Sequence, residues 1–595
     1  DFCEITGRPG TTVVEGFDRF PGARWFPHAR LNFSENLLRH RDDQPAIVFR
    51  PETGGTTELS YAELYQSVAR TAAALRTAGV EKGDRVAGFM PNLPETAIAM
   101  LATTSIGAIW SSCSPDFGID SVVERFGQIQ PKVLFCATAY SYNGKTFDCL
   151  EKVRGIVRNI DSIEQTVVVP YVNPQARINK IANAAWFGQF TDNESNEIDF
   201  EPLPFDHPVY IMYSSGTTGA PKCITHGAGG TLIQHLKELV LHTNLRRNDR
   251  ICYFTTCGWM MWNWMISSLA VGATVVLYEG SPFYPDAGAM FDLVDEQGIT
   301  VLGTGAKAIA AWEKAGVKPR ETHELISLVT LLSTGSPLAP SSFDYVYGDI
   351  KQNLCLSSIA GGTDIISCFI CGCPILPVYR GELQCAGLGM NVKVLREDGS
   401  EADDNETGEL CCASPFPSAP VGFWGDADGS RYRAAYFEKF PGTWAHGDFI
   451  MRSETGGFVI EGRSDATLNP GGVRIGTAEI YRQAEALDEV LESICVGQDW
   501  EDDVRVILFV RLRDGLELDE MLEDRIRRTI RSNTTPRHVP AKIIQVADIP
   551  RTISGKIVEL AVRDVIHGRP VGNRDALANP DALDLYRDLP QLKTT

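Results

Sequence analysis

Hydrophobic residues along the chain follow two spacings that alternate from one segment to the next. Near the N-terminus, apolar and small residues recur at the spacing of one helix face, at Leu64, Val68, Thr71, Ala72 and Leu75. A strand is predicted directly after this helix, at Arg85–Phe89. Further strands are predicted at Ala108–Ser111, Thr274–Tyr278, Thr300–Leu302 and Leu328–Leu332. This alternation predicts an α/β fold, with layered sheets and helices in a large N-terminal domain.

The pattern changes near the C-terminus. Alternate apolar residues predict a half-buried strand at Val504, Val506, Leu508, Val510 and Leu512. A charged helix at Leu518–Arg531 and a strand at Lys542–Val546 follow, which predicts a small α+β domain. The preceding stretch "EGRSDATLNPGG" is polar and rich in turn residues, as is typical of a linker. We therefore expect a large domain over residues 1–464 and a small one over residues 465–595.

Length and composition agree with a sizeable protein of two or more domains. The chain has 595 residues, more than one hydrophobic core normally organises, and an apolar fraction of 44%. Its longest weakly polar stretch, Met265–Tyr278, is too short to cross a bilayer, so we expect no transmembrane helix. The N-terminus shows no secretion signal. It also lacks an initiator methionine, so we expect residues to be missing at the start.

Charge and cysteine content narrow the class further. A net charge of −21 is the wrong sign for a protein that binds nucleic acid or an anionic membrane. Fifteen cysteines, an odd number, indicate reduced thiols and a cytoplasmic location. The pairs Cys371/Cys373 and Cys411/Cys412 lack the matched spacing of a structural zinc site. We expect small-molecule partners and a monomer or weak homo-oligomer.

One loop carries the composition of a phosphate site. The segment "YSSGTTGAPK", Tyr213–Lys222, follows an apolar run and combines hydroxyls, glycines and one lysine. Small residues let backbone N–H groups approach an anion, and Lys222 adds a positive charge. The glycine spacing differs from the usual P-loop, and a plain flexible connection remains the alternative. The candidate phosphate-binding residues are Ser214, Ser215, Gly216, Thr217, Thr218, Gly219 and Lys222.

Four other loops or strand ends carry polar or glycine-rich motifs. They are "LLSTGSPLAP", "SSIAGGTDI", "HGDF" and "EGRSD". Ligands of open α/β sheets bind where strands end. Taken singly, each motif also has a structural explanation: Asp448 as a turn residue, Arg463 as a solvated side chain, and Gly361 and Gly362 as a tight bend.

Together and in this order, the motifs identify a family. The chain resembles the adenylate-forming superfamily of acyl-CoA synthetases, adenylation domains and luciferases over nearly its whole length. The resemblance rests on "YSSGTTGAPK", "GGTD", "HGDF", "GRSD", "NPGGVRIGTAEI" and "IPRTISGK". Within the superfamily, "WFPHARLNFSENLL" and the tail "HGRPVGNRDALANPDAL" are most similar to acetoacetate-activating relatives of the acetyl-CoA synthetases.

The resemblance implies an ATP-dependent acid–thiol ligase. A carboxylate, here acetoacetate, attacks the α-phosphorus of Mg-ATP to give an acyl-adenylate and pyrophosphate. The thiol of coenzyme A then attacks the acyl carbon, which releases AMP and the thioester. Catalysis of the first step is expected to come from positioning and from cations, because negative charge gathers on the phosphoryl centre. The implied cofactors are ATP, Mg²⁺ and coenzyme A.

The resemblance also implies roles for individual residues. Lys556 would bridge the acyl carboxylate and the α-phosphate, and Thr363 and Arg474 would contact phosphate. Asp448 and Arg463 would hold the ribose hydroxyls, and Asp364 would help to hold Mg²⁺. The adenine would lie against the turn formed by Gly335, Ser336 and Pro337. Asp465 would be the hinge of the small domain, and Gly472, without a side chain, would leave room for pantetheine.

Specificity for the acid is expected to depend on a pocket aligned with Trp259, Met260, Met261, Thr334 and Gly361. Gly361 stands where acetyl-CoA synthetases carry tryptophan, so a longer acid is expected to fit, and a Gly361→Trp exchange is expected to favour acetate. The β-keto oxygen needs a donor, either Thr334 or a pocket water. Propionate, butyrate or 3-hydroxybutyrate are alternative acids. A peptide-synthetase adenylation module, a luciferase-like oxidase and a nucleotide-binding regulator without catalysis are alternative functions.

Overall fold

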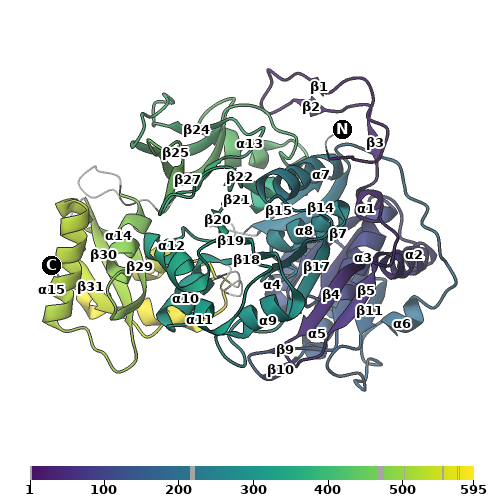
Figure 1. Ribbon diagram of the computed structural model, residues 1–595, viewed down its shortest axis with the longest axis horizontal. Helices are drawn as coiled ribbons and strands as arrows, with labels where there is room; N and C mark the ends of the chain where they lie inside the picture. The colour runs from purple at the N-terminus through teal and green to yellow at the C-terminus, as the bar shows by residue number, and fades with distance from the viewer. Residues whose placement is uncertain are drawn as a thin grey trace.

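The protein folds into a large body of layered sheets and helices with a smaller C-terminal part at one edge (Figure 1). This computed structural model describes residues 3–214, 221–464, 466, 468, 475–500, 503–552, 555–571, 574 and 577–594. The α/β fold class with a small α+β C-terminal part, predicted from the hydrophobic pattern, is confirmed.

Two large sheets form the body, and most of their strands are parallel. In spatial order, the eight-stranded sheet consists of β12 (Ala184–Trp186), β11 (Gln165–Val169), β8 (Val133–Ala137), β6 (Arg85–Phe89), β7 (Ile109–Cys113), β14 (Pro208–Ser214), β15 (Lys222–Gly227) and β26 (Gly422–Phe423). The seven-stranded sheet consists of β20 (Cys355–Ser358), β19 (Thr330–Thr334), β18 (Val301–Gly305), β16 (Arg250–Tyr253), β17 (Thr274–Glu279), β4 (Pro45–Pro51) and β5 (Thr57–Ser60).

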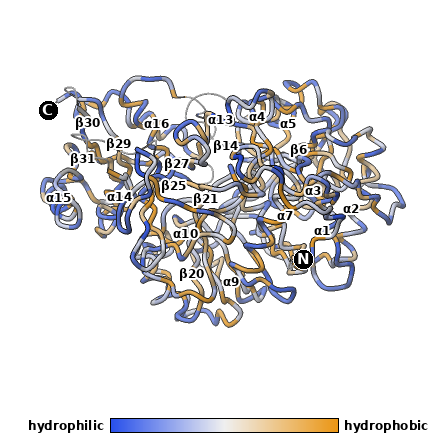
Figure 2. The backbone as a smooth tube through the Cα atoms, turned by 90° about the horizontal axis from the view of Figure 1, so that it is seen from above, coloured by the Kyte–Doolittle hydropathy of each residue, from blue (hydrophilic) through white to orange (hydrophobic). Residues whose placement is uncertain are grey.

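Helices cover both sheets, and one hydrophobic core joins the sheets. Helix α2 (Tyr61–Thr77) is the predicted N-terminal helix, and it is capped by Ser60, whose side chain accepts a hydrogen bond from the Glu63 N–H. The shared core includes Leu64 of α2, Val86 of β6 and Val275 of β17, and Figure 2 shows hydrophobic segments through the interior. The other main helices are α3 (Pro94–Ser105), α4 (Ile119–Ile129), α5 (Leu150–Asn159), α7 (Ala228–Lys237), α8 (Met260–Ile266), α9 (Ala289–Gln297), α10 (Ala306–Lys314) and α12 (Pro340–Tyr345).

Two smaller antiparallel sheets carry several of the sequence motifs. One consists of β24 (Val392–Leu395), β25 (Thr407–Cys412), β27 (Trp444–Arg452) and β28 (Phe458–Arg463). The other consists of β21 (Ala360–Gly362), β22 (Ser367–Cys371) and β23 (Cys385–Ala386). The "HGDF" motif therefore lies within β27, and Arg463 ends the neighbouring strand β28.

The C-terminal part is built on a three-stranded sheet with helices on both faces. Its elements are β29 (Val490–Trp500), β30 (Asp503–Leu512), β31 (Lys542–Gln545), α14 (Thr477–Glu485), α15 (Glu520–Asn533) and α16 (Glu559–Ile566). The expectation that β30 is half-buried was wrong. Val506 and Leu508 pack with Ile526 of α15, whereas Phe509 packs on the other face with Tyr586. Both faces are covered because the middle of β30 is apolar at odd and even positions alike.

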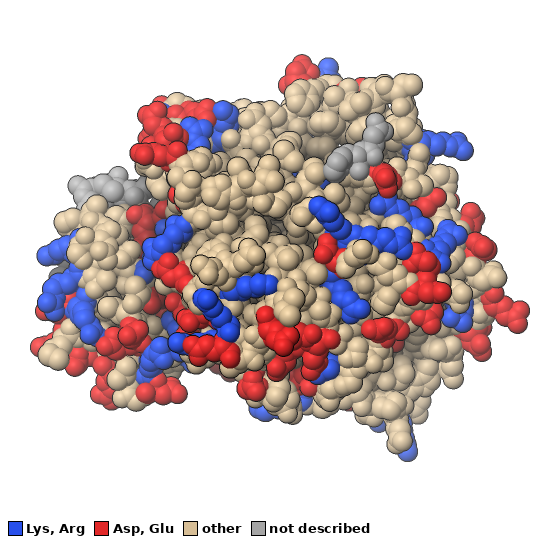
Figure 3. Space-filling model, in the orientation of Figure 1, with Lys and Arg blue, Asp and Glu red and all other residues tan. Residues whose placement is uncertain are grey.

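The surface carries charges of both signs. On the face in Figure 3, basic side chains are scattered among acidic ones. None of the helices in the described ranges is long and apolar enough to span a bilayer.

Glu279, at the end of β17, makes stability depend on pH. Burial raises its pKa to about 8, although the Asn92 backbone N–H donates a 2.6 Å hydrogen bond to its Oε2. Between pH 4.5 and 8, the folded protein retains a proton here that the unfolded chain releases, so this group's contribution to stability falls as pH rises. We expect Glu279→Gln to gain thermal stability relative to wild type from pH 5 to pH 8. A constant difference in melting temperature across that range would contradict this role.

Candidate active site

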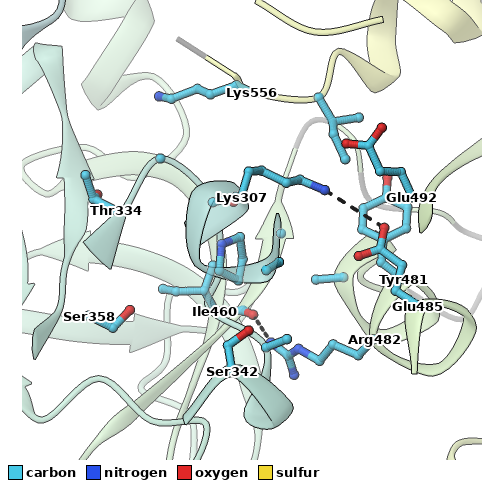
Figure 4. Close-up of a pocket in the computed structure, with 18 of the residues that line it drawn as sticks. Lys307, Thr334, Ser342, Ser358, Ile460, Tyr481, Arg482, Glu485, Glu492 and Lys556 are labelled. Carbon is cyan, nitrogen blue, oxygen red and sulfur yellow. Dashed lines mark hydrogen bonds and ion pairs between the residues drawn. The ribbon is translucent and has the colours of Figure 1, made fainter. Parts of the chain in front are cut away.

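A single cleft collects most of the residues singled out in the sequence. The cleft has a volume of about 870 Å³ and lies between the ends of β19 and β20, the β27–β28 hairpin and the C-terminal part (Figure 4). Its lining includes Trp259, Met260, Met261, Thr334, Gly335, Ser336, Pro337, Gly361, Thr363, Asp448, Arg463 and Lys556. The fold thus brings together residues that lie up to about 300 positions apart in the chain.

The lysine of the glycine-rich loop lies in a polar cluster outside the lining of this cleft. Lys222 begins β15, opposite Ser214 of β14, and its Nζ is 5.6 Å from the Tyr436 ring centroid. The Tyr436 hydroxyl donates a 2.5 Å hydrogen bond to Oδ1 of Asp364. One tyrosine therefore links the lysine to Asp364. The predicted residues Ser215, Gly216, Thr217, Thr218, Gly219, Asp465, Gly472 and Arg474 lie outside the described residues.

Asp364 is held as a carboxylate. Burial by itself raises the pKa of this group, but the nearby charges and the Tyr436 hydroxyl outweigh burial, and the pKa falls below its usual value. The charges that lower it are those of His446, Lys222 and Arg463. Among the described residues, no hydrogen bond reaches the second oxygen, Oδ2. That oxygen is therefore available to a ligand.

Asp448 and Arg463 face each other across the β27–β28 hairpin. They are register partners, and Arg463 Nη1 lies 3.2 Å from Asp448 Oδ1. Gly447 has a φ of +86°, in the left-handed region that favours glycine, and a Cβ there would lie 2.9 Å from Arg463 Nη2. His446 Nε2 lies 3.6 Å from the other Asp448 oxygen. The hairpin therefore presents a carboxylate and a guanidinium side by side at the cleft.

Sequence reasoning missed a buried carboxylate behind this hairpin. Glu409 of β25 accepts hydrogen bonds from the Gly447 N–H at 2.8 Å and from Ser464 Oγ at 3.0 Å. It also pairs with the Lys439 ammonium group. Glu409 thereby fixes the backbone of β27 just before Asp448, and no local sequence signal could have identified it.

Lys556 reaches the cleft from a tight turn of the C-terminal part. The Thr552 N–H donates to the Lys556 carbonyl at 2.8 Å, and Gly555 takes a φ of +80° in this turn. In Figure 4 the lysine side chain extends across one edge of the cleft. The surrounding protein and Arg463 lower the pKa of Lys556, whereas Asp448 and Asp364 raise it. The lysine therefore lies in the electric field of Arg463, Asp448 and Asp364.

At the other end of the cleft, Thr334 and Gly361 differ from what was expected of them in the acid pocket, a hydrogen-bond donor and a position that could hold tryptophan. Thr334 Oγ1 donates a 3.0 Å hydrogen bond to the Ile359 carbonyl, so its single proton is already engaged. Gly361 lines the cleft, but a Cβ there would lie 2.2 Å from the Ser367 carbonyl oxygen and 2.4 Å from the Cys368 Cα. The close approach of β21 to β22 therefore requires glycine, and an indole has no room on this backbone.

Contacts between the large body and the C-terminal part border the cleft, and no sequence motif indicated them. Lys307 of α10 lies 3.9 Å from Glu485 of α14, and Lys314 of α10 donates to the carbonyls of Val490 and Leu491 (Figure 4 draws the first pair). These contacts hold the C-terminal part in the position that places Lys556 at the cleft.

Comparisons with known proteins agree with this geometry. The family model "AMP-binding enzyme" matches residues 33–419, and "AMP-binding enzyme C-terminal domain" matches residues 483–556. Acetoacetyl-coenzyme A synthetase of Rhizobium meliloti (strain 1021) is 55% identical over 100% of this chain and 91% of its own length. Acetoacetyl-CoA synthetase of Mus musculus is 50% identical over 96% of this chain and 86% of its own length.

A solved structure is also similar over the whole chain. Acetoacetyl-CoA synthetase from Streptomyces lividans superposes with a TM-score of 0.93 at 40% identity, covering 100% of this chain and 91% of that one. Fold, site and sequence thus agree over both parts of the molecule. The chain belongs to the AMP-binding enzyme family, within its acetoacetyl-CoA synthetase branch.

Proposed function

We propose that this protein joins acetoacetate to coenzyme A and converts ATP to AMP and pyrophosphate, through an acetoacetyl-adenylate. The observation that carries the proposal is the single cleft, where the turn at Gly335, the Asp448–Arg463 pair and Lys556 meet. A carboxylate is a poor acyl donor, and transfer to the α-phosphorus of ATP gives it a good leaving group.

In the first step, a carboxylate oxygen of acetoacetate attacks the α-phosphorus and pyrophosphate leaves. We propose that Lys556 neutralises the acid and the α-phosphate together, which lowers the barrier without proton transfer. Thr363, Lys222 and the loop residues Ser215–Gly219 would hold the phosphates, and Arg474 would add a second positive charge. Asp448 would accept hydrogen bonds from the ribose hydroxyls, as an ionised, acceptor-only group does.

The residues present fit the Mg²⁺ that accompanies ATP. Asp364 is an ionised carboxylate with one oxygen available, and Mg²⁺ is commonly held by one or two carboxylates together with substrate phosphates and water. We propose that Asp364 holds it. When bound, the ion would neutralise phosphate charge.

In the second step, the thiol of coenzyme A attacks the acyl carbon and AMP leaves. Lys556 occupies the cleft in this structure, so the thiol needs a different placement of the C-terminal part. We propose that residues 465–595 rotate about Asp465 between the steps, and that pantetheine passes beside Gly472. The contacts of Lys307 and Lys314 would break in this rotation.

At the acid end, we propose that water donates to the β-keto oxygen, because the Thr334 proton is bound to Ile359. Met260, Met261 and Trp259 would contact the carbon chain.

The test is AMP release with acetoacetate, acetate and butyrate, each with and without coenzyme A. We expect the highest kcat/KM with acetoacetate, and continuous turnover only with coenzyme A. Preference for propionate, butyrate or 3-hydroxybutyrate would show a ligase of another short acid. Absence of ATP–pyrophosphate exchange with every acid would instead indicate a nucleotide-binding regulator.

A further inference from the structure

Buried polar side chains form a row on α7 and on the π-helical turn after it, η1 (Glu238–His242). These side chains form hydrogen bonds with strand β22 and with the residues directly before and after it. Gln234 Nε2 donates to the Cys368 carbonyl at 3.2 Å, and His235 Nε2 lies 2.8 Å from the Ile366 carbonyl. Ser367 Oγ donates to Glu238, and His242 Nδ1 lies 2.7 Å from the Gly372 carbonyl. Such π-helical turns occur often at functional sites. Here the helix fixes a strand whose first two residues line the cleft.

Glu238 is the centre of this row. Its Oε1 accepts a 2.6 Å hydrogen bond from Gln234, and its Oε2 accepts bonds from Trp264 Nε1 at 2.9 Å and from Ser367. Only 2% of the residue is exposed. An ionised carboxylate only accepts hydrogen bonds, so it satisfies all three donors at once, and these bonds offset the cost of burying the charge.

Two of the partners of Glu238, Trp264 and Ser367, belong to different walls of the cleft. Trp264 lies on α8, whose residues Met260 and Met261 line the acid end. Ser367 begins β22 and lines the same cleft together with its neighbour Cys368. One carboxylate therefore ties the α8 wall to the β22 wall from behind. Movement of either wall would stretch a charge-assisted hydrogen bond, and such bonds are among the strong ones in proteins.

We propose that Glu238 is a positioning residue that sets the width of the acid subsite, and so the choice of acid, without touching the substrate. The inference rests on the proposed function, because it assigns the acid to the space between α8 and β22. A difference of one methylene in the fit of an apolar pocket changes specificity by roughly 10- to 200-fold. A small change in wall separation is therefore expected to appear in acid selectivity rather than in nucleotide binding.

The test compares Glu238→Gln and Trp264→Phe with wild type. The glutamine amide must turn its NH₂ group toward at least one donor, and phenylalanine removes the indole N–H. For each variant we expect the KM for acetoacetate to rise roughly tenfold, the acetoacetate-to-butyrate ratio of kcat/KM to change by at least about fivefold, and the KM for ATP to stay within about twofold. The double variant is expected to have a KM for acetoacetate no higher than that of the more impaired single variant, since both substitutions act on the same Glu238–Trp264 hydrogen bond.

Glu279→Gln is the matched control, because it makes the same exchange at a buried carboxyl group that lies at a strand end outside the cleft lining, and it is expected to keep the wild-type acid ratio. If Glu238→Gln does not fold, Trp264→Phe decides. Variants that lose thermal stability but keep the wild-type acid ratio overturn the inference and leave the proposed function intact. A wild-type protein that activates none of the acids overturns both.

Discussion

Replacing Lys556 with methionine is expected to slow acetoacetyl-adenylate formation by about 10²- to 10³-fold, the usual effect of removing one preorganised charge from a site of developing negative charge. Methionine has a similar length but no ammonium group, so the packing of the turn is kept. The Lys556 side chain is the one from the C-terminal part that lies within the fields of Asp448 and Asp364, as far as the described residues show. The measurement is ATP–pyrophosphate exchange dependent on acetoacetate.

The second half-reaction separates this role from general damage. Synthetic acetoacetyl-adenylate with coenzyme A bypasses the step that needs Lys556, so the methionine variant is expected to form thioester at close to the wild-type rate. Lys593→Met is the control, since this lysine is exposed near the C-terminus. Exchange at the wild-type rate in the Lys556 variant would refute the proposed mechanism. Equal loss in both half-reactions would show instead that the turn or the domain had been damaged.

The pH profile of exchange gives an independent measure of the same group. The protein around Lys556 lowers its pKa, and Arg463 lowers it further, so the lysine loses its proton at lower pH than a solvated lysine does. In wild type, exchange is expected to fall as the pH rises through this lowered pKa, because only the ammonium form is charged. The methionine variant has no such group, and the alkaline decline is expected to disappear from its residual activity.

The elements that the sequence predicted best are those with one dominant period. Helix α2 was found from its apolar face, and β6 was found with its observed bounds, because each buries a side that the spacing defines. Strand β30 is the opposite case, because its apolar residues stand at both odd and even positions and the pattern did not reveal the second buried face. Its cover comes in part from Tyr586, more than 70 positions later, and a local pattern carries no information about such a partner.

The site likewise contains residues that a local pattern identifies and residues that it does not. Motif residues such as Thr363, Asp448 and Lys556 lie in the cleft because Thr363 follows β21, Asp448 lies within β27 and Lys556 closes a turn of the C-terminal part. Tyr436 and Glu238 contact Asp364 and Ser367 across 72 and 129 positions of the chain, and each is a single residue within a helical segment. Sequence patterns identify groups that face a ligand. The residues that hold those groups in place become visible only when the packing is known.

Gly361→Trp is expected to prevent the β21–β22 hairpin from forming, rather than to convert the enzyme into one that prefers acetate. The first side-chain atom would already lie 2.2 Å from the Ser367 carbonyl oxygen and 2.4 Å from the Cys368 Cα, which are backbone atoms of the paired strand. Backbone cannot move aside as a flexible side chain does, so the whole cleft wall would have to shift. We expect little soluble, folded protein from this variant.

Gly361→Ala tests the same steric conflict with a single added methyl group. One added methyl group is expected to lower the free energy of unfolding by about 1–3 kcal/mol, the usual cost of overpacking, measured by urea or thermal unfolding. Gly348→Ala is the control, because an added Cβ there meets nothing within 4 Å and is expected to be neutral or slightly stabilising. Wild-type stability in Gly361→Ala, together with a folded Gly361→Trp variant that turns over acetate, would contradict this steric role. It would support the expectation from the sequence that Gly361 leaves room in the acid pocket where a tryptophan would fill it. Gly361 approaches strand β22, which Glu238 also contacts through Ser367, so substitutions at both positions are expected to disturb the same wall of the cleft.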